Sequence, residues 1–373
     1  MHLERIDVFQ VELPYAGGTY NLSGGRSYTS FDATFVRLTT NTGLEGWGES
    51  TPFGSNYVAA HARGVRAGIE ELAPHLLGTD PRRVDRCNDR MDELLAGHPA
   101  AKTAIDVACW DIFGKSVELP VCELLGGSTD ERMPVISSVH LGDPDDMRAR
   151  VADFRAQGYR GHSVKVGTPD SDGGPALDAA RVAAALADAE PGEYFIVDAN
   201  GGMTPEHALR FLRLLPTGLD FVFEAPCATW RETMSVRRRT DVPIVLDELA
   251  DSTAAVVHAI ADDAADGIGL KVSKNGGLTQ CRRQRDIAIG AGFTMSVQDT
   301  VGSDVSFAAV VHLAQSVPAR NLRCVLDVRG MVTTQTAAID VEIIDGGVMA
   351  PSAPGLGIDV DLDVMGEPVA TWS

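Results

Sequence analysis

Residues 161–273 contain five short apolar segments that each carry a charged residue near their end: GHSVKVG (161–167), YFIVDAN (194–200), FVFEAP (221–226), PIVLDE (243–248) and GIGLKVS (267–273). Amphipathic stretches of helical periodicity separate these segments, which is the pattern of βαβ units. Three further segments follow the same pattern, and the last is the weakest: PVISSVHL (134–141), FTMSVQD (293–299) and NLRCVLD (321–327). About eight such units predict an α/β fold, a (β/α)8-type barrel of the modified TIM kind.

The sequence on either side of this region has a different pattern. Residues 4–12 and 33–40 alternate as strands do, and NTGLEGWGES (41–50) opens with the turn residues expected between paired strands. Helical periodicity then extends from about 57 to 115. We therefore predict an α+β capping domain over 1–125, a barrel over 126–338, and a C-terminal segment over 339–373 that returns to complete the cap.

Charged residues recur at the ends of successive predicted barrel strands, where barrel enzymes place their catalytic groups. Neighbours in this series are 23 to 33 residues apart, about one βα unit, so all five side chains are expected at one rim: Lys165, Asp198, Glu224, Asp247 and Lys271.

The three acids in this series predict a metal site. Carboxylate oxygens are the ligands that Mg²⁺ prefers, and Mg²⁺ keeps positions free for water or substrate. Any one of these acids alone is equally well explained as a helix cap at a strand-to-helix turn. Three in succession, flanked by lysines, favour Asp198, Glu224 and Asp247 as metal ligands.

The two lysines in the series predict proton transfer. The chain has only five lysines, and its other 27 basic residues are arginines, which do not act as bases at ordinary pH. Lys165 and Lys271 on opposite sides of a metal-bound substrate carboxylate would each reach one face of its α-carbon. The alternative for either lysine is a surface salt bridge.

Composition excludes several classes of function. A net charge of −20 argues against nucleic acids and anionic membrane surfaces as partners. The sequence contains neither an apolar run long enough to span a membrane nor an apolar signal core at its start. The six cysteines are scattered without metal-like spacing, which predicts free thiols and a cytoplasmic location.

Taken together, the motifs resemble those of the enolase superfamily, in its mandelate racemase/muconate-lactonising subgroup. The matching pieces are SVKVG (163–167), VDAN (197–200), FEAP (223–226), LDE (246–248) and LKVSKNGG (270–277), together with GWGES, PAAKTAIDVACWDIFGK and APGLGI elsewhere. Enzymes of this superfamily use a Lys or His base together with Mg²⁺ that stabilises an enediolate. The resemblance therefore implies Lys165 and Lys271 as catalysts, Mg²⁺ or substituting Mn²⁺ as cofactor, Asn200 as a substrate-binding residue, and Glu248 beside the metal ligands.

The sequence departs from the family pattern at one position. The family usually has Lys-x-Lys around the first base, whereas this chain has Ser163-Val164-Lys165. Either the missing lysine leaves Lys165 tuned differently, or Ser163 leaves room for another substrate and is a candidate to bind it. The mandelate racemase branch, with a late histidine base, is disfavoured because TMSVQDTVGSD (294–304) has none.

The resemblance also suggests substrate-binding residues. Asp299 and Asp304 are candidates for contacts to a substrate ammonium, although both acids are equally well explained as caps of the following helix, and Thr300 between them is a further candidate for substrate binding. The family's cap places lid loops over the barrel, here 15–27 and 49–57. Tyr20, Phe53 and Tyr57 in these loops would line a small pocket and favour a cationic amine, or would simply pack between the domains.

Among family members, the hydroxyproline-handling enzymes are the most similar. We expect α-proton removal through an enediolate, with dehydration of cis-3-hydroxy-L-proline or a similar cyclic amino acid as the reaction. The alternative is 2-epimerisation or racemisation of betaine-type or N-substituted amino acids. More remote are a cycloisomerase, an acid-sugar dehydratase, and a barrel that binds metal and ligand without turnover. The resemblance further implies a homo-oligomer acting on a small carboxylate.

Overall fold

The computed structural model describes all residues, 1–373. Eight parallel strands form a closed barrel, because the last strand pairs with the first through Val325 and Val135. The strands are β6 (Met133–Val139), β7 (Gly161–Lys165), β8 (Tyr194–Asp198), β9 (Val222–Glu224), β10 (Ile244–Leu246), β11 (Gly267–Lys271), β12 (Thr294–Gln298) and β13 (Leu322–Leu326). The predicted barrel is confirmed, including its weakest strand.

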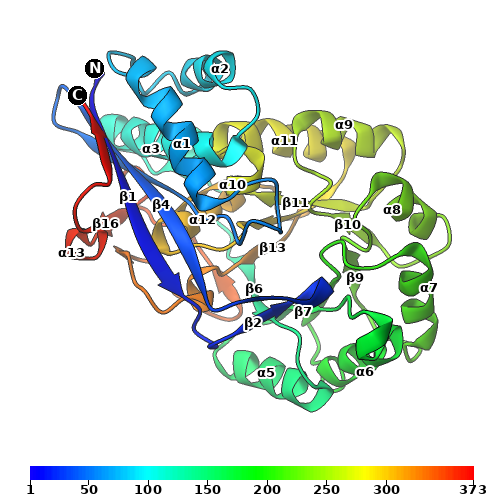
Figure 1. Ribbon diagram of the computed structural model, residues 1–373. Helices are drawn as coiled ribbons and strands as arrows, with labels where there is room; N and C mark the ends of the chain where they lie inside the picture. The colour runs from blue at the N-terminus through cyan, green and yellow to red at the C-terminus, as the bar shows by residue number, and fades with distance from the viewer.

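Helices cover the outside of the barrel (Figure 1). They are α5 (Pro144–Ala156), α6 (Gly174–Ala185), α7 (Pro205–Leu214), α8 (Trp230–Arg237), α9 (Thr253–Ala261), the short α10 (Val272–Asn275) with α11 (Leu278–Ala291), and α12 (Asp304–Gln315). Thr204, Thr229 and Ser252 start three of these helices, because each side chain accepts a hydrogen bond from a backbone N–H in the first turn. No α-helix follows β13 within the barrel, so the last strand closes the barrel without a crossover helix of its own.

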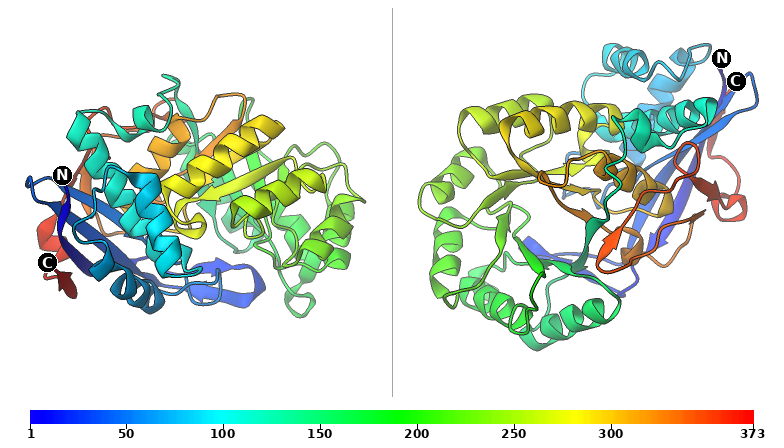
Figure 2. Two further views of the ribbon diagram at one scale, coloured as in Figure 1. Left: turned by 90° about the horizontal axis from the view of Figure 1, so that it is seen from above. Right: turned by 180° about the vertical axis from the view of Figure 1, so that it is seen from behind.

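A separate antiparallel sheet forms the cap, with the strand order β17-β1-β4-β5. Its strands are β1 (Leu3–Pro14), β4 (Ser30–Thr40), β5 (Glu45–Ser50) and β17 (Ala370–Trp372). The C-terminal strand pairs with the N-terminal one, and the two termini lie close together in Figures 1 and 2. The tail thus completes the cap as predicted; it also contains β14 (Ala337–Ile339), β15 (Gly347–Val348), β16 (Ile358–Val360) and α13 (Leu362–Met365).

One long helix joins the cap to the barrel. The cap helices are α1 (Ala62–Leu72), α2 (Val84–Leu94), α3 (Pro99–Val117) and α4 (Val121–Leu124). The residues of α3 are buried on nearly every side, because β5 packs on one side of it and α10 and α11 of the barrel on the other. Its Asp106 accepts hydrogen bonds from the backbone and hydroxyl of Thr279 at the start of α11, which fixes the cap over the barrel.

A hairpin of β2 (Tyr20–Leu22) and β3 (Arg26–Tyr28) extends from the cap to the barrel rim, where Figure 1 shows it near β7. Backbone hydrogen bonds hold it there, from Gly24 N to Gly167 O (3.2 Å) and from Leu141 N to Asn21 O (3.1 Å). No helix in the structure combines the length and the apolar character needed to span a lipid bilayer.

Candidate active site

The carboxyl ends of β7 to β11 bring the predicted residues together. Strand pairing places Lys165 opposite Asp198 and Asp198 opposite Glu224, and Asp247 directly follows β10. Lys271 ends β11 and pairs with Gln298 at the end of β12. All five side chains proposed for catalysis and metal binding are therefore buried at one rim of the barrel.

The two lysines lie at opposite ends of the row of acids. Lys165 donates to Asp198 Oδ2, while Lys271 Nζ lies 2.6 Å from Asp247 Oδ2. Burial lowers the pKa of both lysines, but the adjacent carboxylates outweigh it and the net direction for each pKa is upward. Each ammonium thus neutralises an outer carboxylate, and Glu224 between them has no lysine of its own.

Glu224 is the acid whose pKa shows the repulsion among the three carboxylates most directly. Burial, followed by the nearby carboxylates of Asp198 and Asp247, raises its pKa well above the ordinary value. Its only side-chain donor is Gln298 Nε2, 3.3 Å from Oε1. A cation that binds these oxygens would relieve the repulsion that raises this pKa.

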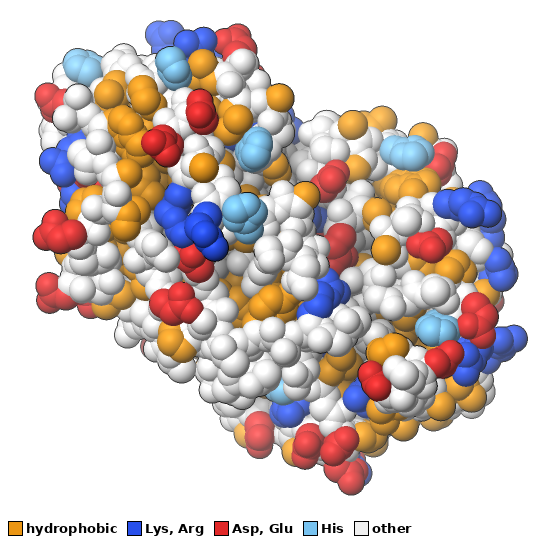
Figure 3. All heavy atoms as spheres, viewed as in Figure 1, with side chains coloured by type: hydrophobic (Ala, Val, Ile, Leu, Met, Phe, Trp, Pro, Cys, Tyr) orange, Lys and Arg blue, Asp and Glu red, His pale blue; other side chains and the backbone are white.

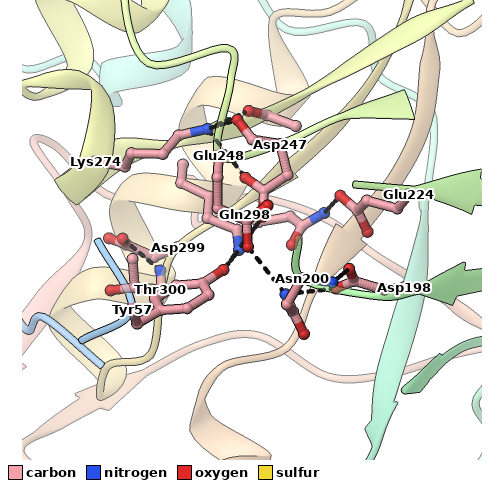
Figure 4. A network of polar contacts seen from close by, with 12 residues as sticks. Tyr57, Asp198, Asn200, Glu224, Asp247, Glu248, Lys274, Gln298, Asp299 and Thr300 are labelled. Atoms are coloured by element: carbon pink, nitrogen blue, oxygen red, sulfur yellow. Dashed lines mark hydrogen bonds and ion pairs between the residues drawn. The ribbon is translucent and has the colours of Figure 1, made fainter. Parts of the chain in front are cut away.

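Asn200 and Glu248 complete the polar network shown in Figure 4. Asn200 Nδ2 donates to Asp198 Oδ2 (2.9 Å) and to Glu248 Oε1 (3.2 Å). The other oxygen of each side chain, Asn200 Oδ1 and Glu248 Oε2, is buried and has no hydrogen-bond partner. Two orphaned oxygens beside three carboxylates fit a site for a hard cation and its water.

The three carboxylates do not surround a common metal position in this structure. No three Asp, Glu, His or Cys groups are clustered tightly enough to bind a metal ion together, and Asp198 and Asp247 are each paired with a lysine. The donor chemistry nevertheless fits Mg²⁺, and release of the two ion pairs would free the required oxygens.

Lys274 is a site residue that sequence reasoning missed. Its buried ammonium lies 3.0 Å from Asp247 Oδ1 and 3.3 Å from Gly269 O, and it also donates to Asp247 O. Burial raises the pKa of Asp247, but Lys271 and Lys274 outweigh it and the net direction is downward. The scarcity of lysine in this chain and the place of Lys274 in the LKVSKNGG motif were the signals that could have identified it.

The lid residues meet the barrel from the cap side. Tyr57 OH donates to Asp247 Oδ2 (3.2 Å) and accepts from Lys271. Phe53 packs between the rings of Tyr57 and Tyr20, with ring centres 5.4 and 5.2 Å away. This row of three aromatic rings therefore crosses the mouth of the barrel.

The three candidates after β12 are already engaged within the protein. Both oxygens of Asp299 accept hydrogen bonds, from Ser273, Thr300 and Ser306, and Thr300 Oγ1 donates to Thr51 O. Asp304 Oδ2 instead accepts from the backbone of Thr336 and Ala337. Neither acid forms the predicted cap of the following helix, because the backbone N–H groups of Ser303 and Ser306 at the start of α12 donate to Glu49 instead. Only Thr300 lines a cavity near the site.

That cavity, of about 440 Å³, lies between the cap and the barrel and is lined by Tyr57, Glu248, Lys274 and Thr300, among others. Figure 3 shows a hollow between the two parts of the molecule, with acidic side chains along it. A small organic substrate therefore has space beside the charged network.

Comparison with known proteins identifies the enzyme family to which the chain belongs. Residues 146–364 match the enolase C-terminal domain-like family, and residues 25–126 match the mandelate racemase / muconate lactonizing enzyme N-terminal domain. The chain belongs to this family of the enolase superfamily, whose characterised relatives are lyases and isomerases, and it is therefore an enzyme.

Three proteins illustrate how similar the chain is to known relatives in this family. A cis-3-hydroxy-L-proline dehydratase from Roseibium aggregatum is 39% identical over the full length of both chains. An N-succinyl-L-Arg/Lys racemase from Bacillus cereus is 27% identical over 98% of both chains. A solved structure from Roseovarius nubinhibens, assigned to the mandelate racemase/muconate lactonizing enzymes and complexed with magnesium, is 56% identical with a TM-score of 0.99 over all of both chains.

Proposed function

We propose that this enzyme uses Mg²⁺ to remove the proton next to a substrate carboxylate, and that its reaction is the dehydration of cis-3-hydroxy-L-proline or a similar cyclic amino acid. The observation that carries the proposal is the placement of two buried lysines at opposite ends of a row of three carboxylates. The full-length similarity to a cis-3-hydroxy-L-proline dehydratase supports the substrate class.

Asp198, Glu224 and Asp247 would hold the Mg²⁺, or a Mn²⁺ in its place. When bound, the cation supplies Lewis acidity that stabilises negative charge on the substrate carboxylate. Asn200 keeps the ligand at the end of β8, Asp198, in place, and its second hydrogen bond links it to Glu248. A ligand-deficient variant such as Asp198→Asn should bind Mg²⁺ at least about tenfold more weakly in calorimetry; unchanged affinity would reject that ligand.

The stereochemistry of the substrate requires a base and an acid on opposite faces of its ring, and two lysines can supply them. In cis-3-hydroxy-L-proline the hydroxyl and the carboxylate lie on one face of the ring, so the α-proton lies on the other face. A base on one face then takes the α-proton while an acid on the opposite face protonates the departing hydroxyl. Lys165 and Lys271 supply these two groups, and the loss of water gives an enamine that tautomerises to a ketimine.

An epimerase remains the second candidate, because the same two lysines would invert an α-carbon by exchanging roles, and the racemase from Bacillus cereus shares the family. Betaine-type or N-substituted amino acids would be its substrates. In that case the substrate would have no group to lose at C3.

Proton NMR in D₂O with Mg²⁺ separates these reactions. We expect cis-3-hydroxy-L-proline to lose its hydroxyl and yield a ketimine. Deuterium at the α-carbon with inversion of proline betaine or 4-hydroxyproline betaine, and no dehydration, would establish the epimerase instead. Absence of both dehydration and α-exchange with every compound would reject the proposed substrate class.

We further propose a cytoplasmic location and a homo-oligomeric assembly. All six cysteines are unpaired and buried, which supports a reducing compartment. Chromatography with light scattering would measure the assembly, and a monomer would contradict it.

A further inference from the structure

Arg26 is the one side chain whose hydrogen bonds reach both lid loops and the barrel. It begins β3 and lies in the first lid loop, 15–27. Its Nε donates to Ser23 O (2.9 Å) and its Nη2 to Ser23 Oγ (3.0 Å), which ties the hairpin tip together. Its Nη1 donates to Asn56 O in the second lid loop (3.2 Å), and its Nη2 also donates to Asn200 O on the barrel (3.3 Å). The planar guanidinium, with five donors, is suited to joining acceptors that lie in different directions.

The barrel rim is shaped to receive the hairpin tip that Arg26 ties together. Ser23 at this tip is completely buried, and glycines of two barrel turns lie against it. A Cβ added at Gly167, after β7, would lie 2.7 Å from Ser23 Cβ, and one added at Gly202, after β8, would lie 2.9 Å from it. Larger residues at these two positions would keep the hairpin off the rim. The tip therefore docks closely beside the strands that carry Lys165 and Asp198.

The two segments that Arg26 reaches both carry residues of the site. Asn200 has a left-handed backbone (φ 43°), which costs energy in a residue other than glycine, so a hydrogen bond to its carbonyl oxygen helps to hold this turn. Asn56 directly precedes Tyr57, whose ring centre lies 5.9 Å from the guanidinium of Arg26. Figure 4 shows that Asn200 and Tyr57 belong to one polar network. Arg26 thus links the lid to both sides of this network.

We infer that Arg26 is a positioning residue for the reaction: it holds the two lid loops to each other and to the barrel, and thereby keeps Tyr57 over the cavity. Four of its five N–H donors bond protein oxygens, so the guanidinium is engaged by the protein rather than available to a substrate carboxylate. All of these acceptors are neutral, so the lid can open for substrate without the separation of an ion pair. The inference rests on the proposed function for the substrate used in the kinetic test.

Steady-state kinetics with cis-3-hydroxy-L-proline and Mg²⁺ test this role in Arg26→Met, which removes all four hydrogen bonds. A lid that is closed for less of the time lowers the apparent affinity for substrate in proportion. We expect KM to rise about tenfold and kcat to stay within about twofold, because saturating substrate holds the lid closed. Arg66→Met is the matched control: Arg66 binds Asp32 through both terminal nitrogens within the cap (2.8 and 2.9 Å), so its loss should leave KM unchanged.

Hydrogen exchange followed by mass spectrometry reports on the lid without any turnover. In the Mg²⁺-loaded Arg26→Met enzyme, peptides covering 15–28 and 49–60 should exchange about tenfold faster than in the wild type, whereas peptides from α3 should not change. Faster exchange in only one lid loop would show that Arg26 does not join the two loops. That result, a rise throughout the protein, no change in either loop, or a fall in kcat with unchanged KM would each overturn the inference.

Arg26→Lys separates the joining of the loops from an effect of charge. Lysine keeps the positive charge but has a single nitrogen, so it cannot bond acceptors in all of these directions, and both KM and lid exchange should stay close to those of Arg26→Met. Wild-type values in Arg26→Lys would assign the effect to charge and overturn the inference. This variant also decides the question if thermal melts show that Arg26→Met does not fold. If the wild-type enzyme does not turn over cis-3-hydroxy-L-proline, the proposed function fails, and the exchange comparison still decides the role of Arg26.

Discussion

At the scale of single residues, the site depends on how a few buried charges are paired. Three of the five lysines in the chain contact Asp198 or Asp247, and all three are almost fully buried. A buried charge is tolerated only when it is paired and hydrogen-bonded. Lys274 has no part in the proposed proton transfer, and its contacts therefore indicate a role in holding Asp247.

Lys274→Met should lower the free energy of unfolding by about 3 kcal/mol, because it leaves a buried carboxylate oxygen and two backbone carbonyls without their charged donor. Urea denaturation measures the change. Lys102→Met is the matched control: Lys102 is also buried, but its partner Asp92 is half exposed, so a loss of about 1 kcal/mol or less is expected. Equal stability of the two variants would contradict the role of Lys274.

At the scale of elements, the contact between β5 and α3 sets the position of the cap. Gly46 and Gly48 on β5 allow the strand to approach the helix backbone closely. A Cβ added at Gly48 would lie 2.1 Å from the carbonyl oxygen of Ala104, and one at Gly46 would lie 2.3 Å from that of Ala108. Any side chain at these positions would push α3 away from the sheet and against the barrel helices that pack on its other side.

Gly48→Ala should therefore destabilise the protein by about 3 kcal/mol, a cost typical of overpacking against backbone that cannot yield. Gly290→Ala is the control, because Gly290 lies within α11 with open space around its Cβ position. Alanine there should stabilise by about 0.5–1 kcal/mol. Thermal unfolding that shifts both variants in the same direction would contradict the packing argument.

The elements also show which features a sequence can reveal. The strands of the barrel and the charged residues at their ends were predictable, because both depend on local periodicity and spacing. The engagement of Asp299 and Asp304 was not, since position at a rim does not reveal which oxygens already accept hydrogen bonds. The contact between Tyr20 in the lid hairpin and Ser138 on β6 was not predictable either, because these residues are 118 positions apart in the chain.

At the scale of the whole molecule, His312 joins three parts of the chain. It lies in α12 of the barrel, and its Nδ1 accepts a hydrogen bond from the backbone N–H of Cys122 in α4 of the cap (3.2 Å). Its Nε2 lies 3.1 Å from the carbonyl oxygen of Leu356 in the C-terminal segment. The hydrogen bond from Cys122 requires the neutral imidazole, because a protonated ring has no acceptor nitrogen, whereas Nε2–H can donate to the Leu356 carbonyl oxygen in either state.

This arrangement predicts a loss of stability in mild acid. Burial lowers the pKa of His312 to about 4, whereas an unfolded histidine titrates at about 6.5. Between these values the unfolded chain binds the additional proton, so the free energy of unfolding falls as the pH decreases from about 6.5 to about 4. The difference between the two pKa values corresponds to about 3 kcal/mol at the acid end of this range.

His312→Gln removes this titration. The decrease in the free energy of unfolding between about pH 6.5 and about pH 4 should therefore be about 3 kcal/mol smaller in the variant than in the wild type. At neutral pH the variant should be less stable than the wild type, because its hydrogen bonds are poorer. Urea denaturation at closely spaced pH values measures the slope. His75→Gln, at an exposed position, controls for the loss of an imidazole from the surface. A slope in His312→Gln equal to that of the wild type would show that His312 does not couple cap, barrel and tail to pH.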